Sequence, residues 1–375
     1  MPSIIMIFVS VISICWILTQ RKYPPSSDFG SVDAIVPAFN EESCIIETVR
    51  CLAANPYLNK IIVVNDGSTD RTGAVLDLLA VNVPRLTVVH QKNTGKGGAL
   101  MNGLRHSDAA HVFLTDADTV VPADDDGIGY MIAEIERGAD AVGGIALSNL
   151  SGAGLLPHVR ASTKLACVAV VRIFQQLFGG HPFLISGACG LFKRDVLLDV
   201  QFSDRTKVED LDMTWSMISR GYKVRQASRA FVYSQECNSL KSEWLRWRRW
   251  IVGYAVCMRL HSKLLLTRFG LGTIIPVFLT SFLASALVIY TIVSSSLLHG
   301  HHFTVYTATW LGLMFLIGLA SAIHHRKPAL LLLVPGSVVY VLMSSAVWLV
   351  HGLYGLLTGY EPQRDKPTRY AHVVA

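Results

Sequence analysis

The chain has 375 residues, of which 51% are hydrophobic and only 16% are charged, and its mean hydropathy is +0.41. This composition is too apolar for an ordinary soluble enzyme and makes a membrane protein the first expectation. The formal net charge of +6 would suit nucleic acid, but the basic residues flank apolar segments instead of forming a continuous stripe, so no nucleic-acid partner is expected.

The first element is the uncharged run from Pro2 to Leu18, which is followed by Arg21 and Lys22. It is about long enough to span a bilayer. A cleaved signal peptide is the alternative, but its positive charges would precede the apolar core and no A-x-A site is present. We therefore expect residues 1–20 to form a transmembrane helix whose C-terminal end is cytosolic, followed by a short linker.

From Val32 to about Ser234, short strand-like runs alternate with helical stretches, which predicts a parallel sheet covered by helices on both faces. We assign this cytosolic globular domain to residues 30–237. The predicted strands are VDAIVPAF, KIIVVN, LTVVH, HVFLTD and DAVGGI, and the predicted helices between them cover residues 41–54, 71–80, 97–104 and 125–137. Ligands bind beyond the carboxyl ends of such strands, and Asn40, Glu41, Asp66 and Asp116 fall there.

Carboxylates follow two of these strands. Asp66 ends the second strand in VVNDGSTD, whereas Asp70 in the same turn is expected only to cap the next helix. Asp116 and Asp118 follow the fourth strand in FLTDADT. Residues two apart on an extended segment face the same side, so both carboxylates could approach one Mg²⁺ or Mn²⁺ ion whose other ligands come from a substrate diphosphate. A helix cap plus a turn is the alternative.

Two further motifs carry charged residues at predicted helix starts. NTGKGGALMNGL places Lys96 in a glycine-rich turn suited to an anionic group, although such a turn is more often structural. In RTKVEDLDMTWSMISRGY, Glu209 and Asp210 begin a helix that ends near Gly221. Asp210 is the candidate general base. The helix dipole is the better explanation for Asp212.

The segment SEWLRWRRWIVGYAVCMRLHSK lies within residues 238–268 and has an apolar stripe at helical spacing. The stripe consists of Trp244, Trp247, Ile251, Tyr254 and Met258. We expect an amphipathic helix at the membrane interface, with Arg249 on the opposite side, toward the soluble domain. GLLPHVRASTKLACVAVVRIFQQLFGG predicts a second interfacial helix or an internal core helix.

Residues 271–357 form a predicted C-terminal membrane region. The runs Leu271–Leu298 and Phe303–Ile323 are each long enough to cross the bilayer. Pro335 and Gly336 interrupt the last run, 329–357, so a re-entrant or interfacial hairpin with a cytosolic tail at 358–375 is favoured over a single tilted span. The chain is thus expected to be a multi-pass protein of the plasma (inner) membrane, in contact with membrane lipids.

Seven motifs in one order resemble the membrane-integrated family 2 glycosyltransferases of the GT-A fold, above all processive synthases of poly-N-acetylglucosamine, hyaluronan, chitin and cellulose. The motifs are VPAFNEE, VVNDGSTD, NTGKGGAL, TDADT, SGACGLF, VED and RWRRW. The resemblance implies an α/β domain with a Rossmann-like parallel sheet, Mg²⁺ or Mn²⁺, and inverting transfer from a UDP-sugar to a growing polysaccharide, with a possible export partner in the envelope. Transfer to a lipid acceptor, or a non-catalytic subunit that binds a nucleotide sugar, are the alternatives.

The resemblance also assigns roles to single residues. Asp210 would be the catalytic base, with Glu209 beside it, and Asp118 would be the metal ligand together with Asp116. The donor site would be lined by Pro37, Ala38, Asn40, Glu41, Asp66, Lys96, Asp116 and Arg249. The acceptor site would contain Trp250, Arg246, Cys189 and Gly190. Arg249 and Trp250 match the last two positions of the family's QxxRW signature, whereas the glutamine at its first position is Arg246 here.

Overall fold

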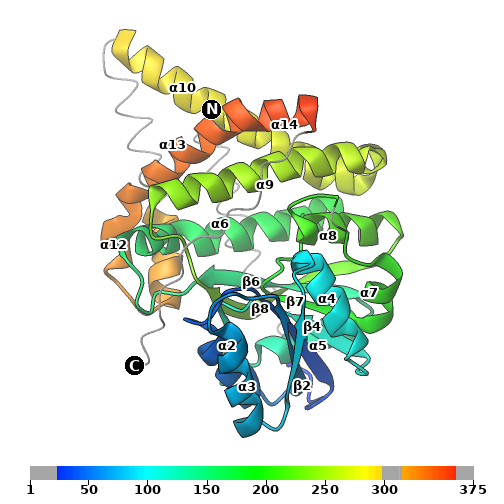
Figure 1. Cartoon of the computed structure of the whole chain (residues 1–375). Coiled ribbons are helices and arrows are strands. Elements are labelled where there is room, and N and C mark those ends of the chain that lie inside the picture. The colour runs from blue at the N-terminus through cyan, green and yellow to red at the C-terminus, as the bar shows by residue number, and fades with distance from the viewer. Residues whose placement is uncertain (1–22, 204, 298–311, 313–314, 360–375) are drawn as a thin grey trace. The chain divides into compact units, whose positions relative to one another are not determined.

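The computed structural model describes residues 23–203, 205–297, 312 and 315–359, which fall into two compact units (Figure 1). The sheet unit comprises Pro24–Ala153 and His181–Cys237. The helical unit comprises Gly154–Gly180 and Asn238–Asp365, described as far as Gly359. The segment 154–180 lies inside the predicted domain 30–237, yet it groups with the helices that follow residue 237.

The strands of the sheet unit are β1 (Val32–Ala38), β2 (Leu58–Asp66), β3 (Leu86–Gln91), β4 (His111–Leu114), β5 (Thr119–Val120), β6 (Ala141–Ser148), β7 (Gly190–Lys193) and β8 (Val224–Ser234). Over the described residues they form one eight-stranded sheet in the order β3-β2-β1-β4-β7-β6-β8-β5. The neighbours among β1 to β4 are parallel, as predicted.

The prediction of a parallel sheet is wrong beyond β4, because β7 pairs antiparallel with both β4 and β6, and β5 pairs antiparallel with β8. Neither β5 nor β7 is among the predicted strands. They are two and four residues long, so their sequences carry no signal of the direction in which they pair. The fold is a mixed α/β sheet.

The predicted helices of the sheet unit are confirmed, with small shifts at their ends. They are α2 (Ile45–Ala54), α3 (Thr72–Asn82), α4 (Gly95–Arg105), α5 (Gly127–Glu136) and α8 (Glu209–Ser219), and the structure adds α7 (Arg194–Val200). Strands β5, β7 and β8 are also additions. Exposed and buried positions do not alternate regularly along β8, VRQASRAFVYS, so this strand lacks the period-two pattern of a half-buried strand.

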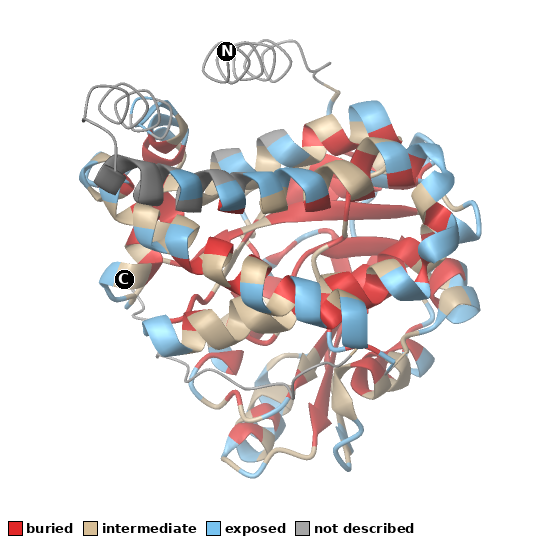
Figure 2. Ribbon diagram, turned by 90° about the horizontal axis from the view of Figure 1, so that it is seen from above, coloured by how far each residue is buried: buried red, intermediate tan, exposed pale blue. Residues whose placement is uncertain are grey.

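Side chains along β1 alternate between two buried clusters, one on each face of the sheet. Val36 packs in the cluster that contains residues of α2, α3 and α5, whereas Ile35 packs in the cluster that contains residues of α4, α7 and α8. Because both faces of the sheet are covered, the sequence of β1 is a nearly continuous apolar run. Figure 2 shows the central strands largely in the colour of buried residues, whereas β3 is mostly intermediate.

The described part of the helical unit consists of helices of very different lengths. They are α6 (Leu155–Gly179), α9 (Leu240–Leu260), α10 (Ile275–Leu297), the helix Phe315–His324, α12 (Leu330–Leu333), α13 (Val338–Val347) and α14 (Leu353–Thr358). The predicted helix over 238–268 is thus present as α9 and the short 3-10 helix Ser262–Leu266, and the predicted run 271–298 is present as α10 with the π turn Gly270–Ile274 before it.

Among the described residues, one helix is long and apolar enough to cross a bilayer. It is the continuous run Leu330–Thr358, 29 residues with a mean hydropathy of 2.1 in its most apolar window. One such helix is weak evidence, since a buried core helix meets the same criteria. The favoured hairpin is wrong: the chain forms a 3-10 turn at Val334–Ser337 and continues as a helix. The predicted span 1–20, most of 303–323 and nearly all of the tail lie outside the described residues.

The apolar stripe of α9 is partly covered by the protein itself. Ile251 is fully buried, and α9 packs against α13 and α14. The ring of Trp244 lies edge-on to that of His351, 5.9 Å between centroids. Neighbouring helices of the same unit therefore cover the stripe at Ile251, and the place of this helix at a membrane interface stays a prediction.

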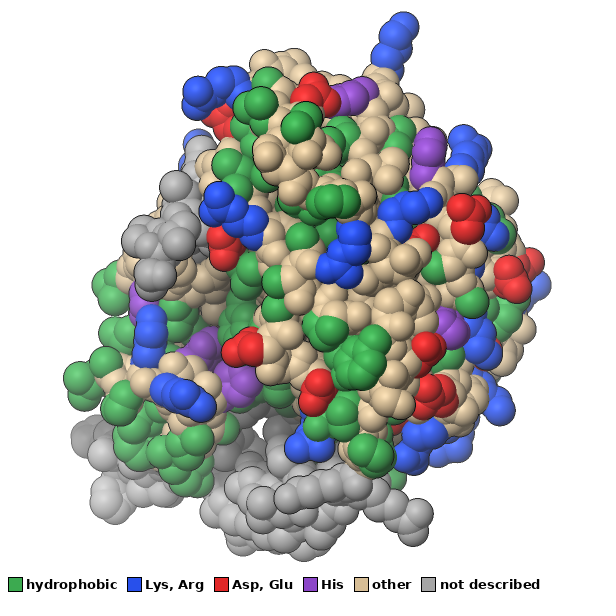
Figure 3. All heavy atoms as spheres, turned by 90° about the horizontal axis from the view of Figure 1, so that it is seen from below, with side chains coloured by type: hydrophobic (Ala, Val, Ile, Leu, Met, Phe, Trp, Pro, Cys, Tyr) green, Lys and Arg blue, Asp and Glu red, His purple; other side chains and the backbone are tan. Residues whose placement is uncertain are grey.

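Charged side chains on the face shown in Figure 3 are of both signs and are interspersed with apolar and uncharged groups. This face therefore lacks the single-sign field that attracts a polyanion over a long distance.

Candidate active site

The loops that follow β1 and β2 are hydrogen-bonded to each other. Asn40 has a left-handed backbone (φ 53°), and its Oδ1 accepts the N–H of Thr69 at 2.7 Å. The N–H of Glu41 donates to Oγ1 of Thr72 at 2.7 Å. Asp70 accepts the N–H of Thr72, the first residue of α3, at 2.9 Å, which agrees with the expected capping role. The two loops are thereby held together at the carboxyl edge of the parallel strands.

Asp66, the last residue of β2, is 3% exposed and fixes the start of α4. Its Oδ1 accepts the N–H of Thr94 at 2.8 Å and Nε2 of Gln91 at 2.7 Å. Thr94 immediately precedes α4, the helix that carries Lys96. Asp66 therefore helps to position Lys96, and its contact with a nucleotide base stays a prediction.

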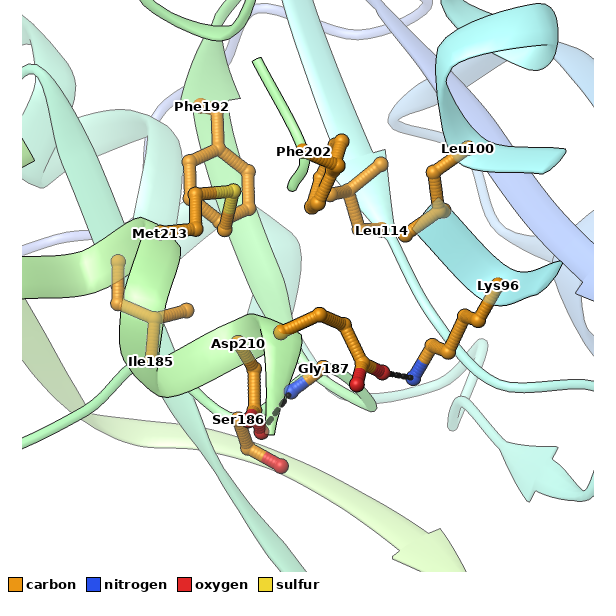
Figure 4. Close-up of a pocket in the computed structure, with 11 residues that line it drawn as sticks. Lys96, Leu100, Leu114, Ile185, Ser186, Gly187, Phe192, Phe202, Asp210 and Met213 are labelled. Carbon is orange, nitrogen blue, oxygen red and sulfur yellow. Dashed lines mark hydrogen bonds and ion pairs between the residues drawn. The ribbon is translucent and has the colours of Figure 1, made fainter. Parts of the chain in front are cut away.

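Lys96 brings two predicted site carboxylates together. Its Nζ lies 2.6 Å from Oδ1 of Asp116, beyond β4, and 3.3 Å from Oε1 of Glu209, on α8. The Lys96 side chain is only 14% exposed, whereas that of Asp116 is 34% exposed. Figure 4 shows Lys96 and Asp210 extending from different elements toward the same region. One ammonium group therefore pairs with two carboxylates.

The carboxylate of Asp210 is held by two backbone N–H groups. Oδ2 accepts the N–H of Gly187 at 3.2 Å, and Oδ1 accepts the N–H of Leu211 at 2.9 Å. Gly187 fits here because it has no side chain: a Cβ atom would lie 2.8 Å from Nζ of Lys96. The loop before β7 therefore comes close to both the candidate base and the lysine.

Further contacts tie this loop to α8. Oγ1 of Thr214 accepts the N–H of Ile185 at 3.0 Å and donates to the carbonyl of Asp210 at 2.7 Å. The fully buried Trp215 donates its indole N–H to the carbonyl of Phe183 at 2.8 Å. These hydrogen bonds fix the position of Asp210 relative to the loop before β7.

The pKa of Asp210 is raised above the ordinary value of 3.8, first because packing removes water from the carboxyl group and second because Glu209 is negative. The charge of Lys96 and the N–H groups of Gly187 and Leu211 act in the opposite direction. A carboxylate with a raised pKa beside a cation is a common feature of proton-transfer sites.

A cavity of about 10 Å³ adjoins this cluster, enough for roughly one water molecule. One side of it is polar and the other is closed by apolar side chains (Figure 4). Its lining comprises Lys96, Leu100, Leu114, Ile185, Ser186, Gly187, Phe192, Phe202, Glu209, Asp210 and Met213.

Asp116 and Asp118 lie on a turn, and the expected extended geometry is wrong. The carbonyl of Asp116 accepts the N–H of Thr119 at 3.1 Å, which turns the chain from β4 into β5. Asp118 is 5% exposed. Among the described residues no three His, Cys, Asp or Glu side chains form a metal-binding group. Two carboxylates still fit Mg²⁺ or Mn²⁺ if phosphate oxygens and water complete the coordination, as is common for Mg²⁺.

Four other predicted residues belong to strands or their ends. Pro37 is partly exposed and Ala38 is 1% exposed on β1. Cys189 is 1% exposed beside Gly144, and Gly190 is buried at the start of β7. Packing accounts for Cys189 and Gly190, and their contact with an acceptor stays a prediction.

Three predicted residues belong to the helical unit and not to the sheet unit that contains the carboxylate cluster. They are Arg246, Arg249 and Trp250, all on α9. Arg246 is bound by Glu243, one turn earlier on the same helix. The predicted contact of Arg249 with a diphosphate stays a prediction. Sequence reasoning missed Glu243, although its spacing of 3, 4 and 7 residues from Arg246, Trp247 and Trp250 follows the helical period.

Comparison with known proteins agrees with this architecture. The family described as "Glycosyl transferase family 2" matches residues 33–200. The chain is 52% identical over 378 aligned residues to "Uncharacterized glycosyltransferase YaiP" of Escherichia coli (strain K12), an alignment that covers 100% of this chain and 95% of that protein. It is 28% identical to poly-beta-1,6-N-acetyl-D-glucosamine synthase of Staphylococcus aureus (strain COL), covering 60% of this chain and 55% of that enzyme.

A solved structure shows the same fold. It is the mannosyltransferase PcManGT from Pyrobaculum calidifontis in complex with GDP-Man and Mn²⁺, with a TM-score of 0.57 and 18% identity, covering 94% of this chain and 99% of that one. The fold is therefore GT-A-like. On the near full-length relationship to the Escherichia coli protein and the match over 33–200, this chain belongs to glycosyl transferase family 2.

Proposed function

We propose that this protein transfers a sugar from a UDP-sugar to the hydroxyl group of a growing polysaccharide, with inversion at the anomeric carbon. The observation that carries the proposal is the cluster in which Lys96 pairs with Asp116 and Glu209 beside Asp210. It combines a candidate base of raised pKa with charged groups at a strand end, where ligands bind in α/β sheets.

In this reaction, Asp210 accepts the proton of the attacking hydroxyl group. The new bond forms between the acceptor oxygen and the anomeric carbon as the bond from that carbon to the diphosphate breaks, and UDP leaves with the bonding electron pair. Lys96 and Arg249 neutralise negative charge on the diphosphate. A single displacement converts an α-linked donor to a β-linked product.

Asp118 and Asp116 would hold Mg²⁺ or Mn²⁺, which stabilises the leaving diphosphate when bound. These two carboxylates fit such an ion, because hard divalent cations bind to one or two protein carboxylates together with substrate phosphates. Asn40, Glu41 and Asp66 would line the nucleotide pocket, and Trp250 would stack on the acceptor sugar.

Polysaccharide extension is favoured by the relationship to the poly-N-acetylglucosamine synthase. We also propose that the chain is integrated in the plasma membrane by several helices and passes its product outward. In its favour, the helical unit exposes large apolar residues on α10, α12, α13 and α14, including Leu283 (66%), Leu332 (82%) and Leu357 (71%).

A lipid acceptor is the second candidate. Arg246 replaces the glutamine of the resembled signature and is bound by Glu243, so an acceptor site of the polysaccharide type would differ at this position. Transfer of one or a few sugars to a membrane lipid would need no product channel.

The test is nucleotide release by the full chain in lipid nanodiscs with Mn²⁺. UDP-glucose, UDP-N-acetylglucosamine, UDP-galactose, UDP-glucuronate and GDP-mannose are compared, and products are sized on a gel. A long product from one UDP-sugar is expected. A small glycolipid formed only with added lipid would favour the second candidate, and no release from any donor would favour a non-catalytic subunit.

Asp210→Asn tests the base directly. The substitution keeps an oxygen for one backbone N–H group but removes the proton acceptor, so donor binding should persist and transfer should fall by about 100-fold or more. Donor affinity is measured by calorimetry and transfer by nucleotide release. Asp199→Asn, at an exposed surface pair with Arg220, is the matched control. An active Asp210→Asn variant would remove Asp210 from this role.

A further inference from the structure

One carboxylate of the helical unit is buried between two arginines. The side chain of Glu243 on α9 is fully buried, and it forms ion pairs with Arg160 on α6 and with Arg246 on its own helix. Its Oε1 also accepts the indole N–H of Trp247 at 3.0 Å. A buried carboxylate is costly unless it is paired and hydrogen-bonded, so these partners are needed for Glu243 to be ionised there.

The same two arginines lie over the ring of Trp250. The guanidinium carbon of Arg246 is 5.1 Å from the centre of this ring, and that of Arg160 is 5.6 Å from it. Both distances fall within the range of cation–π attraction. The side chains of Arg160 and Arg246 are only 12% and 13% exposed, which limits screening by water.

Three helices contribute to this arrangement. Glu243, Arg246 and Trp250 are three, then four residues apart and so lie on one side of α9. Arg160 also lies 5.7 Å from the ring of Tyr340 on α13, and the hydroxyl of Tyr340 donates to the carbonyl of Leu156 on α6 at 2.9 Å. The ring of Trp250 is thus fixed by contacts that originate from more than one helix.

We infer that Glu243, Arg160 and Arg246 are positioning residues that hold the ring of Trp250 in one orientation for stacking on the acceptor sugar. The role of Trp250 comes from the proposed function, on which this inference rests. It gives a reason for arginine at the first position of RWRRW: the side chain of Arg246 is directed to Glu243 and the face of Trp250.

Substitutions of the two arginines by glutamine test this inference in the full chain in nanodiscs. The probe is a soluble β-1,6-linked N-acetylglucosamine oligosaccharide with UDP-N-acetylglucosamine as donor. Arg160→Gln should raise the acceptor KM by about tenfold while the donor KM stays the same, because cation–π contacts of 1 to 2 kcal/mol correspond to about this factor. Arg259→Gln, an exposed arginine on α9, is the matched control and should change neither value.

The effect of Arg160→Gln is also measured in the Trp250→Ala variant, which shows whether Arg160 acts through Trp250. If Arg160 acts through Trp250, Arg160→Gln should have no further effect on the acceptor KM of the Trp250→Ala variant. Equal effects of Arg160→Gln in both backgrounds, or an unchanged acceptor KM in Arg160→Gln alone, would overturn the inference. If Trp250→Ala itself leaves the acceptor KM unchanged, the proposed role of Trp250 fails.

Thermal stability separates the buried ion pairs from the proposed function, since it needs no substrate. Arg160→Gln and Arg246→Gln should each lower Tm modestly, because the other arginine still neutralises Glu243. The double variant should lower Tm by more than the sum of the two single decreases, because Glu243 is then unpaired. Adding Glu243→Gln to the double variant should restore much of the lost Tm. Simple additivity would show that the two arginines do not share Glu243 and would overturn the inference even if no transfer is detected.

Discussion

At the residue scale, Lys96 forms ion pairs with residues of two different parts of the sheet unit. It pairs with Asp116 beyond β4 and with Glu209 on α8, and its charge lowers the pKa of Asp210 against the raising effects of burial and of Glu209. The lysine therefore has a second consequence besides its predicted contact with the nucleotide. It keeps more of the candidate base deprotonated than burial alone would allow.

The pH dependence of sugar transfer should report the opposing effects of burial and of Lys96 on the pKa of Asp210. Asp210 is a base only when deprotonated, so activity should fall as pH decreases through its pKa, at a higher pH than for an ordinary aspartate. Lys96→Met removes the positive charge that lowers the pKa of Asp210. The acidic limb of the pH–activity profile should therefore move to still higher pH. The measurement is kcat/KM against pH in both proteins.

Lys60→Met is the control, because the contacts of Lys60 lie at the surface, with the carbonyl of His106 at 3.2 Å and with Asp108 at 3.9 Å. It should leave the acidic limb in place. An acidic limb that stays in place or moves to lower pH in Lys96→Met would show that Asp210 does not control it.

At the element scale, α4 determines where Lys96 can be. Asp66 holds the start of this helix through the N–H of Thr94, and Gly103 lets its other end approach the sheet. A Cβ atom on Gly103 would lie 2.4 Å from Cγ2 of Ile35 and 3.2 Å from Cγ2 of Val64, both in fully buried residues of β1 and β2. The helix therefore has no room for even a methyl group at this point.

Gly103→Ala should destabilise the protein by about 1 to 3 kcal/mol, because overpacking forces helix and strands apart. The shift should also move Lys96, so the donor KM should rise. Tm and nucleotide release measure the two effects. Arg105→Ala, an exposed position on the same helix, is the control. Unchanged stability in Gly103→Ala would show that α4 can move away from the sheet at little cost.

At the scale of the whole molecule, the chain combines an α/β unit with a helical unit whose apolar side chains are often exposed. Leu330–Thr358 is the described helix that could cross a bilayer, and Val339 and Leu342 on α13 are 43% and 42% exposed. Large apolar side chains at such positions are unfavourable in water and favourable in lipid.

Cysteine labelling in inverted membrane vesicles tests this span. In a chain whose seven native cysteines are replaced by serine or alanine, Val339→Cys and Leu342→Cys should be protected from a membrane-impermeant maleimide. Leu78→Cys, 68% exposed on α3 of the sheet unit, should react fully. Rapid labelling of all three cysteines would mean that Leu330–Thr358 does not lie in the hydrocarbon layer.

The sequence by itself determined the elements whose signals are local. The strand runs of β1 to β4, the polar residues at their ends and the helix that begins at Glu209 all follow from short periodic patterns and turn residues. Motif order was enough to indicate the family, because each motif is a contiguous stretch whose residue types are tied to one local geometry.

Only the tertiary structure decided the contacts between distant segments. Short β7 carries no periodic signal, and its antiparallel place between β4 and β6 depends on where its neighbours lie. Likewise, Lys96 meets Glu209 across more than a hundred residues, and Arg160 meets Glu243 across 83. Ion pairs of this kind leave no local pattern, because only the complete fold brings the partners together and buries them, and burial makes a charged group depend on its partner.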